Sequence, residues 1–227
     1  MKRVQPLSAD RLDAFSKSQW ETILSRATLY ECKAGERLHE QGEVDDRLIL
    51  LLCGKVGMNR AVGRQENRTG ILKGRGETLS NSGFYLQTPR ALSSVVYEDG
   101  TRILVFHRSD VFALCSEIAE FTDYLFRNIA GQLYNTLDYV RQLRELSADK
   151  RVALRVLELF RSYGEVPVTQ AELGEIVGVS RVTVSKSLAE LDSLELVARR
   201  YGRIDVIDEE GLERWISPNL PVLGGNV

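Results

Sequence analysis

The sequence has few cysteines, no long hydrophobic run and no signal-peptide core. Its longest apolar run, Leu48 to Cys53, is far too short to cross a bilayer, which takes about 20 apolar residues. The three cysteines, Cys32, Cys53 and Cys115, lie far apart, so we expect neither a disulfide framework nor a Cys-x-x-Cys metal pair. The N-terminal segment lacks the apolar core of a secretory signal. These absences predict a cytoplasmic protein without a membrane anchor.

The chain also lacks an excess of charge of either sign. Its 30 Lys and Arg residues against 32 Asp and Glu residues give a net charge of −2 at pH 7. This balance excludes a strongly basic nucleic-acid binder but leaves room for a local basic patch. The 227 residues, of which 43% are hydrophobic and 27% charged, are enough for two compact domains.

The first half of the chain has the residue pattern of a β-roll. From residue 29 to 107, short apolar runs alternate with glycines, which is typical of compact all-β structure. The turn sequence Glu98-Asp99-Gly100-Thr101 predicts a hairpin between the runs on either side of it. Before the roll, residues 8–26 predict one helix that Ser8 caps. We expect a sensor domain over residues 1–108.

A segment almost free of glycine and proline follows, and it predicts a long helix over residues 109–146. Its apolar residues recur every three or four positions, the period of a left-handed coiled-coil seam. A helix that lies on the core of its own domain is the alternative, but the narrow seam favours pairing with a second copy of the chain. The expected dimer-interface residues are Leu125, Ile129, Leu133, Leu137, Val140 and Leu143.

Residues 168–196 carry the pattern of a helix-turn-helix. Thr169-Gln170-Ala171-Glu172 is a capping box for one short helix, Gly178 suits the turn, and Ser180 caps a second helix. In such a motif the second helix enters the DNA major groove. Residues 196–206 then predict two strands joined by a turn, a basic wing. We expect this winged domain to span residues 147–218, with a tail at 219–227.

The second helix exposes side chains suited to reading DNA bases. Arg181 and Lys186 can donate to guanine, and Val182 can contact a thymine methyl group. Hydroxyl and amide side chains at the helix starts, and the wing arginines, suit phosphate oxygens. A helical hairpin that only packs is the alternative, but caps, turn and basic residues all agree with DNA binding. The expected DNA-binding residues are Thr169, Gln170, Ser180, Arg181, Val182, Thr183, Ser185, Lys186, Arg199, Arg200 and Arg203.

These segments together resemble the CRP/FNR (cyclic-AMP receptor protein-like) family of bacterial transcription regulators. The letters GERLHEQGE at 35–43 resemble the opening strands of that family's roll, and TQAELG at 169–174 with VGVSR at 177–181 resemble its DNA-binding domain. The resemblance implies an α+β fold with a cyclic-nucleotide-binding-like roll, a dimerisation helix and a winged helix-turn-helix. It also implies a homodimer on a palindromic DNA site with half-sites about 34 Å apart, and contact with RNA polymerase.

Two positions depart from the family pattern within the second helix. Many members carry Glu directly after the recognition arginine, where this chain has Val182, and Lys186 replaces a second base-contacting arginine. A different DNA half-site is therefore expected.

The resemblance also bears on what the roll binds. Members that bind cyclic nucleotides use a Gly-Glu pair for the ribose, an Arg-Ser or Arg-Ala pair for the phosphate, and hydroxyls of the long helix for adenine. The matching candidates for effector binding are Glu77, Arg90, Ala91 and Thr136. Against this, residues 78–87 lack the apolar pattern of the short helix found there in such members, and Arg90 fits a solvated loop equally well. The sequence leaves open a cyclic nucleotide, another small ligand or none.

Other cofactors and function classes fit less well. An iron–sulfur cluster needs closely spaced cysteines, haem needs axial ligands, and His39 and His107 are the only histidines. The sequence lacks metal-ligand clusters, GxSxG and Walker A motifs, so we expect no metal and no enzyme activity. A nucleotide-sensing module that acts on protein partners is the alternative function, which the helix-turn-helix disfavours. The operator, the target genes and the choice between activation and repression stay open.

Overall fold

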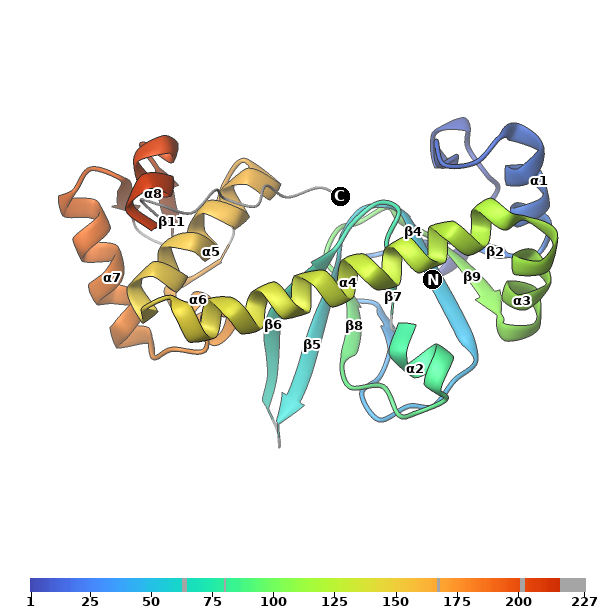
Figure 1. The fold of residues 1–227 in the computed structure, drawn as a ribbon, viewed down its shortest axis with the longest axis horizontal. Helices are drawn as coiled ribbons and strands as arrows, with labels where there is room; N and C mark the ends of the chain where they lie inside the picture. Colours follow the sequence, from blue (N-terminus) through green and yellow to red (C-terminus); the bar gives the residue numbers. More distant parts are fainter. Residues whose placement is uncertain (63–64, 80, 167, 201–202, 217–227) are drawn as a thin grey trace. The chain divides into compact units, whose positions relative to one another are not determined.

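In the computed structural model the chain divides into two compact units, residues 1–133 and 134–227 (Figure 1). The structure describes residues 1–62, 65–79, 81–166, 168–200 and 203–216. The division falls inside helix α4 (Ala119–Glu145), which both units share. The domain limits at 108, 146 and 218 stay a prediction, and the predicted tail lies outside the described residues.

Two antiparallel sheets form the roll of the first unit, as the sequence predicts. One has the strand order β1-β2-β9-β4-β7 and the other the order β3-β8-β5-β6. The strands are β1 (Lys2–Arg3), β2 (Thr28–Cys32), β3 (Arg37–His39), β4 (Arg47–Cys53), β5 (Val56–Val62), β6 (Gln65–Lys73), β7 (Thr78–Leu79), β8 (Ser93–Val96) and β9 (Thr101–His107).

Strand β4 contributes to two hydrophobic cores at once. Successive side chains of a strand point to opposite faces. Leu48, Leu50 and Leu52 accordingly pack with residues of α1 (Lys17–Ser25), α3 (Arg108–Glu117) and α4, whereas Ile49 and Leu51 pack between the sheets. Both faces of β4 are buried, which explains its unbroken apolar run.

The first predicted helix is shorter than expected. Ser8–Asp10 forms only a 3₁₀ turn, and α1 covers Lys17–Ser25. Ser16 and Gln19 cap α1 reciprocally, and this box fixes the helix start eight residues later than predicted.

The predicted hairpin at Glu98–Thr101 is wrong, although its turn is present. Gly100 has a φ of 76°, but β8 pairs with β3 and β5 while β9 pairs with β2 and β4. The turn therefore joins the two sheets. The carboxylate of Asp99 accepts from Ala34 N at 2.8 Å, so the turn also anchors the loop after β2.

The predicted helix over 109–146 is two helices. Helix α3 covers Arg108–Glu117, and α4 begins at Ala119. Between them Ile118 has an extended backbone and buries its side chain in the first core. A further helix, α2 (Asn81–Leu86), lies where none was expected, and its buried Phe84 belongs to that same core.

The second unit contains the predicted helix-turn-helix and the predicted wing strands. Its elements after α4 are α5 (Ala148–Tyr163), α6 (Gln170–Val177), α7 (Arg181–Ser193), β10 (Val197–Arg200), β11 (Arg203–Val206) and α8 (Glu209–Ile216). Helix α5 packs against α6, α7 and α8. The wing strands pair antiparallel, and the turn at 201–202 lies outside the described residues.

Candidate functional site

Side-chain caps fix the start of both helices of the helix-turn-helix. Thr169 Oγ1 accepts from Glu172 N at 3.2 Å, and the Glu172 carboxylate accepts from Thr169 N at 2.8 Å. The Ser180 hydroxyl accepts from Thr183 N at 3.1 Å. Between the helices Gly178 has a φ of 74°, which glycine adopts without strain. Thr169 and Ser180 therefore already serve as caps.

Gly174 sets how closely α6 approaches the turn. A Cβ atom added to Gly174 would lie 2.8 Å from the carbonyl oxygen of Val179, closer than real Cβ atoms come. Only glycine allows this contact, so Gly174 helps to fix the angle between α6 and α7.

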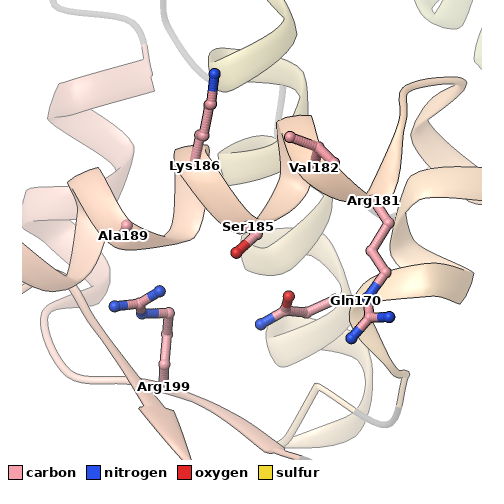
Figure 2. Close-up of a pocket in the computed structure, with 7 residues that line it drawn as sticks. All are labelled: Gln170, Arg181, Val182, Ser185, Lys186, Ala189 and Arg199. Carbon is pink, nitrogen blue, oxygen red and sulfur yellow. The ribbon is translucent and has the colours of Figure 1, made fainter.

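The exposed side of α7 borders a shallow hollow of about 450 Å³ (Figure 2). Six of the residues predicted to bind DNA line it, whereas Thr169, Ser180, Thr183, Arg200 and Arg203 do not. The lining residues are Gln170, Arg181, Val182, Ser185, Lys186, Ala189 and Arg199. The sequence interpretation missed Ala189, although its spacing from Ser185 and Lys186 places it on the same helix face.

The cations of this surface differ in their partners. Arg199 pairs with Asp192 at 3.3 Å, Arg200 pairs with Asp205 at 2.8 Å, and Arg203 contacts Asp205 as well. In the part of the chain that the structure describes, Arg181 and Lys186 have no ion pair. Among the described residues, helix α7 thus presents cations without ion pairs, whereas the wing presents paired ones.

The exposed seam of α4 differs from the predicted one at its first residue. Leu125 is only 4% exposed and belongs to the first core, so its assignment to a dimer interface is wrong. Phe126, one residue later, is 65% exposed and lies seven residues before Leu133. Of the other predicted interface residues Ile129 is half-buried, and the exposed ones are Leu133, Leu137, Val140 and Leu143. The narrow periodic pattern identified the helix but not which of two adjacent apolar residues faces outward.

Helix α4 is hydrogen-bonded to the roll through three polar side chains that the sequence interpretation missed. The hydroxyl of Tyr124 donates to Gly76 O, Asn128 Oδ1 accepts from Thr78 N at 3.0 Å, and Gln132 Nε2 donates to Thr78 O at 2.9 Å. Their spacing of four residues places them on one helix face, a signal that the sequence contains.

Two of the four predicted effector residues, Glu77 and Arg90, interact with other groups of the protein in this structure. The Glu77 carboxylate accepts from Gly74 N at 2.7 Å and pairs with Lys73 at 2.7 Å, so it closes a turn. Ala91 is exposed, and Thr136 is exposed on α4 in the second unit.

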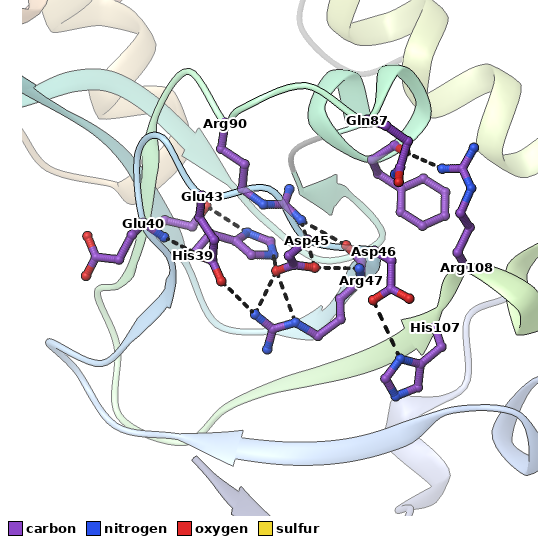
Figure 3. A network of polar contacts seen from close by, with 12 residues as sticks. His39, Glu40, Glu43, Asp45, Asp46, Arg47, Gln87, Arg90, His107 and Arg108 are labelled. Atoms are coloured by element: carbon purple, nitrogen blue, oxygen red, sulfur yellow. Dashed lines mark hydrogen bonds and ion pairs between the residues drawn. The ribbon is translucent and has the colours of Figure 1, made fainter.

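Arg90 is buried, contrary to the alternative of a solvated loop residue (Figure 3). Its guanidinium lies 3.3 Å from Asp45 Oδ1 and donates to Arg47 O at 3.1 Å. Burial alone would raise the pKa of Asp45, but hydrogen bonds from Arg47 and the charge of Arg90 hold it below its usual range. Burial lowers the pKa of neighbouring His39 to about 3, and the charge of Arg90 acts in the same direction.

Comparison with known proteins decides the family. A model of the Crp-like helix-turn-helix domain matches residues 150–215. The cyclic AMP receptor protein of Thermus thermophilus is 32% identical over 183 residues, which cover 79% of this chain and 83% of that protein. The chain belongs to the CRP/FNR family. It is a transcription regulator with a helix-turn-helix DNA-binding domain, as its sequence predicts.

Further proteins are similar to the chain in sequence or in fold. The CRP-like cAMP-activated global transcriptional regulator of Mycobacterium tuberculosis is 26% identical over 190 residues, covering 79% of this chain and 84% of that protein. The structure of the c-di-GMP responsive global regulator CLP of Xanthomonas campestris is similar with a TM-score of 0.72 at 14% identity, covering 84% of this chain and 99% of that one. The second likeness concerns the fold alone.

The residues of this CRP/FNR regulator fit a cyclic nucleotide only in part. Arg90 carries the charge that a phosphate needs, but Asp45 already neutralises it inside the roll. Glu77 is held by Gly74 and Lys73 and does not fit the ribose role. The short helix that nucleotide-binding members have in this region, which the sequence of residues 78–87 does not predict, is present as α2.

The described residues contain neither a membrane-spanning helix nor a metal-binding cluster. No helix there is long and apolar enough to span a membrane. No group of three or more His, Cys, Asp or Glu side chains there is arranged to hold a metal ion.

Proposed function

We propose that this regulator binds a palindromic DNA site as a homodimer, with α7 of each copy in the major groove of one half-site. The observation that carries the proposal is the hollow along α7, where exposed Arg181 and Lys186 have no ion-pair partner among the described residues. Desolvated in a major groove, these two cations would gain guanine O6 and N7 as acceptors. Val182 is 64% exposed between them and suits a thymine methyl group.

The experiment begins with operator selection from a random duplex pool, followed by binding titrations with the full chain. Arg181→Ala should weaken binding by about 1–3 kcal/mol and relax the preference at one base position. Glu175→Ala is the control, because Glu175 is exposed on α6 and does not line the hollow. An equal loss of affinity on random DNA would mean that Arg181 contacts only phosphate, and no binding of any selected DNA would overturn the proposal.

For the dimer we propose a coiled-coil contact along Phe126, Leu133, Leu137, Val140 and Leu143. These side chains are between 43% and 65% exposed in the single chain, and the first four of them follow a heptad spacing. Exposed apolar rows of this kind mark association surfaces.

We further propose that an effector acts through Arg90, by replacing Asp45 at its guanidinium. Carboxylate and phosphate groups bind guanidinium with the same fork geometry, so a ligand anion can take the place of Asp45. Thermal denaturation with cyclic AMP and cyclic GMP tests the ligand class, since a bound ligand raises the melting temperature by mass action. A melting temperature unmoved by either nucleotide would exclude cyclic nucleotides as that anion.

The remaining roles follow from the family. We propose that the protein works in the cytoplasm, controls transcription by contacting RNA polymerase and has no catalytic activity. Transcription in vitro from a promoter that carries the selected operator, with and without the protein, tests the polymerase contact.

A further inference from the structure

The wing contains two arginines that share one carboxylate. Arg200 and Arg203 lie directly opposite each other in the β10–β11 register, a placement in which like charges repel. Asp205 Oδ2 lies 2.8 Å from Arg200 Nε, and Asp205 Oδ1 contacts Arg203 Nε. The Asp205 side chain is 19% exposed, against 70% for Arg200 and 62% for Arg203. The carboxylate is therefore mostly buried beneath the two guanidinium groups, which face the solvent.

The third wing arginine has a carboxylate of its own. Asp192, near the end of α7, accepts from both the backbone N–H and the Nε of Arg199, each at 3.3 Å. Two acidic residues thus occupy three wing arginines, whereas the cations of the recognition helix have no such partner among the described residues.

A phosphate that approaches the wing has to compete with these carboxylates. Guanidinium groups bind carboxylate and phosphate in the same way. Exposed ion pairs are weak, so DNA phosphates can displace the carboxylates from the arginines. The free energy of each lost ion pair, however, offsets part of the binding free energy that the phosphate contact contributes. Phosphate contacts carry no sequence information and dominate sequence-independent binding.

We propose that Asp192 and Asp205 are specificity-determining residues, which limit sequence-independent binding by occupying the wing arginines. This inference rests on the proposed DNA-binding function. With the wing partly neutralised, the base contacts of α7 decide which DNA is bound.

The test measures the binding of a random-sequence duplex and of the selected operator between about 50 and 200 mM salt. Over this range the affinity that comes from phosphate contacts falls steeply. Asp205→Asn and Asp192→Asn remove the charge at nearly constant shape. Both should bind the random duplex several-fold more tightly, with a smaller gain on the operator. The salt slope should steepen by about 0.9 for each arginine that gains a phosphate. Arg200→Gln added to Asp205→Asn should cancel part of that gain.

Glu210→Gln is the matched control, because it removes one negative charge from the same domain at a residue paired with Arg214 rather than with the wing. An equal gain in Glu210→Gln, or an unchanged salt slope in folded Asp205→Asn, would overturn the inference. If Asp205→Asn does not fold, Asp192→Asn tests the same mechanism at Arg199. Failure of the unmodified protein to bind any selected operator would instead overturn the proposed function.

Discussion

The hydroxyl of Ser187 donates a hydrogen bond to Oδ1 of Asp149 at 2.6 Å. Ser187 is buried in the middle of α7, and Asp149 lies in the first turn of α5, two residues after the cap at Ser147. The recognition helix is therefore bonded to the start of the helix that opens the DNA-binding domain.

Replacing Ser187 with Ala should destabilise the second unit by about 1.5–3 kcal/mol, because a buried hydrogen bond to a charged acceptor is lost. Urea denaturation measures the loss. Ser193→Ala is the control, since the exposed Ser193 hydroxyl donates only to Glu190 O within α7. Equal stability of the two variants would mean that the Ser187–Asp149 bond contributes nothing.

Gly174→Ala should cost about 1–3 kcal/mol of stability, because its methyl group would overpack against the backbone of Val179. Operator affinity should fall as well, since the angle between α6 and α7 changes. Gly131→Ala is the opposite case, because a Cβ atom there meets nothing within 4 Å in α4. That variant should gain about 0.5–1 kcal/mol from the higher helix propensity of alanine. A neutral Gly174→Ala in urea denaturation would contradict the close approach.

His39 should make the first unit less stable in acid. Its pKa is about 3 when folded, against 6.5 for an exposed histidine, so between these values the unfolded chain binds the extra proton. Unfolding free energy should therefore fall as pH decreases through this window, by up to about 1.4 kcal/mol per pH unit. The lowered pKa of Asp45 acts in the same direction, but only below its ordinary value near 3.8.

His39→Gln should flatten that dependence between pH 6 and about 4.5, the part of the window above the Asp45 range. Urea denaturation at several pH values measures the slope of the variant and that of the unmodified protein. Identical slopes in His39→Gln and the unmodified protein would show that another group carries the acid sensitivity.

Phe126→Glu and Leu133→Glu should separate the proposed dimer into folded monomers. Both side chains are exposed in the single chain, so the charge disturbs the seam rather than the core. Asn135→Glu adds the same charge to α4 at an exposed position off the seam. Sedimentation velocity measures the oligomeric state, and a dimer that survives Leu133→Glu would place the contact elsewhere.

The features that depend on neighbouring residues were predictable from the sequence. The capping box at Thr169, the cap at Ser180 and the turn at Gly178 involve residues at most three positions apart, and each lies where it was predicted. The wing strands follow from the same local pattern. The CRP/FNR family and its fold could therefore be inferred before the structure.

Several of the errors concern pairings between distant segments. Strands β8 and β9 do not pair with each other, because β8 pairs with β5 and β9 pairs with β4 instead. The environment of Arg90 depends on Asp45, 45 positions earlier, and a pattern of neighbours does not reveal that the two meet. Leu125 and Phe126 are both apolar, and only the packed core distinguishes them.

The bonds from Tyr124, Asn128 and Gln132 to the backbone at Gly76 and Thr78 determine the rotational phase of α4. A shift of one residue turns a helix by about 100° and would break all three bonds together. The roll thereby selects which side chains of α4 point outward within the first unit, Phe126 and Leu133 among them. A change in the conformation of the loop before β7 would consequently rotate α4. The outward side chains would then point in another direction, although none of them had been altered.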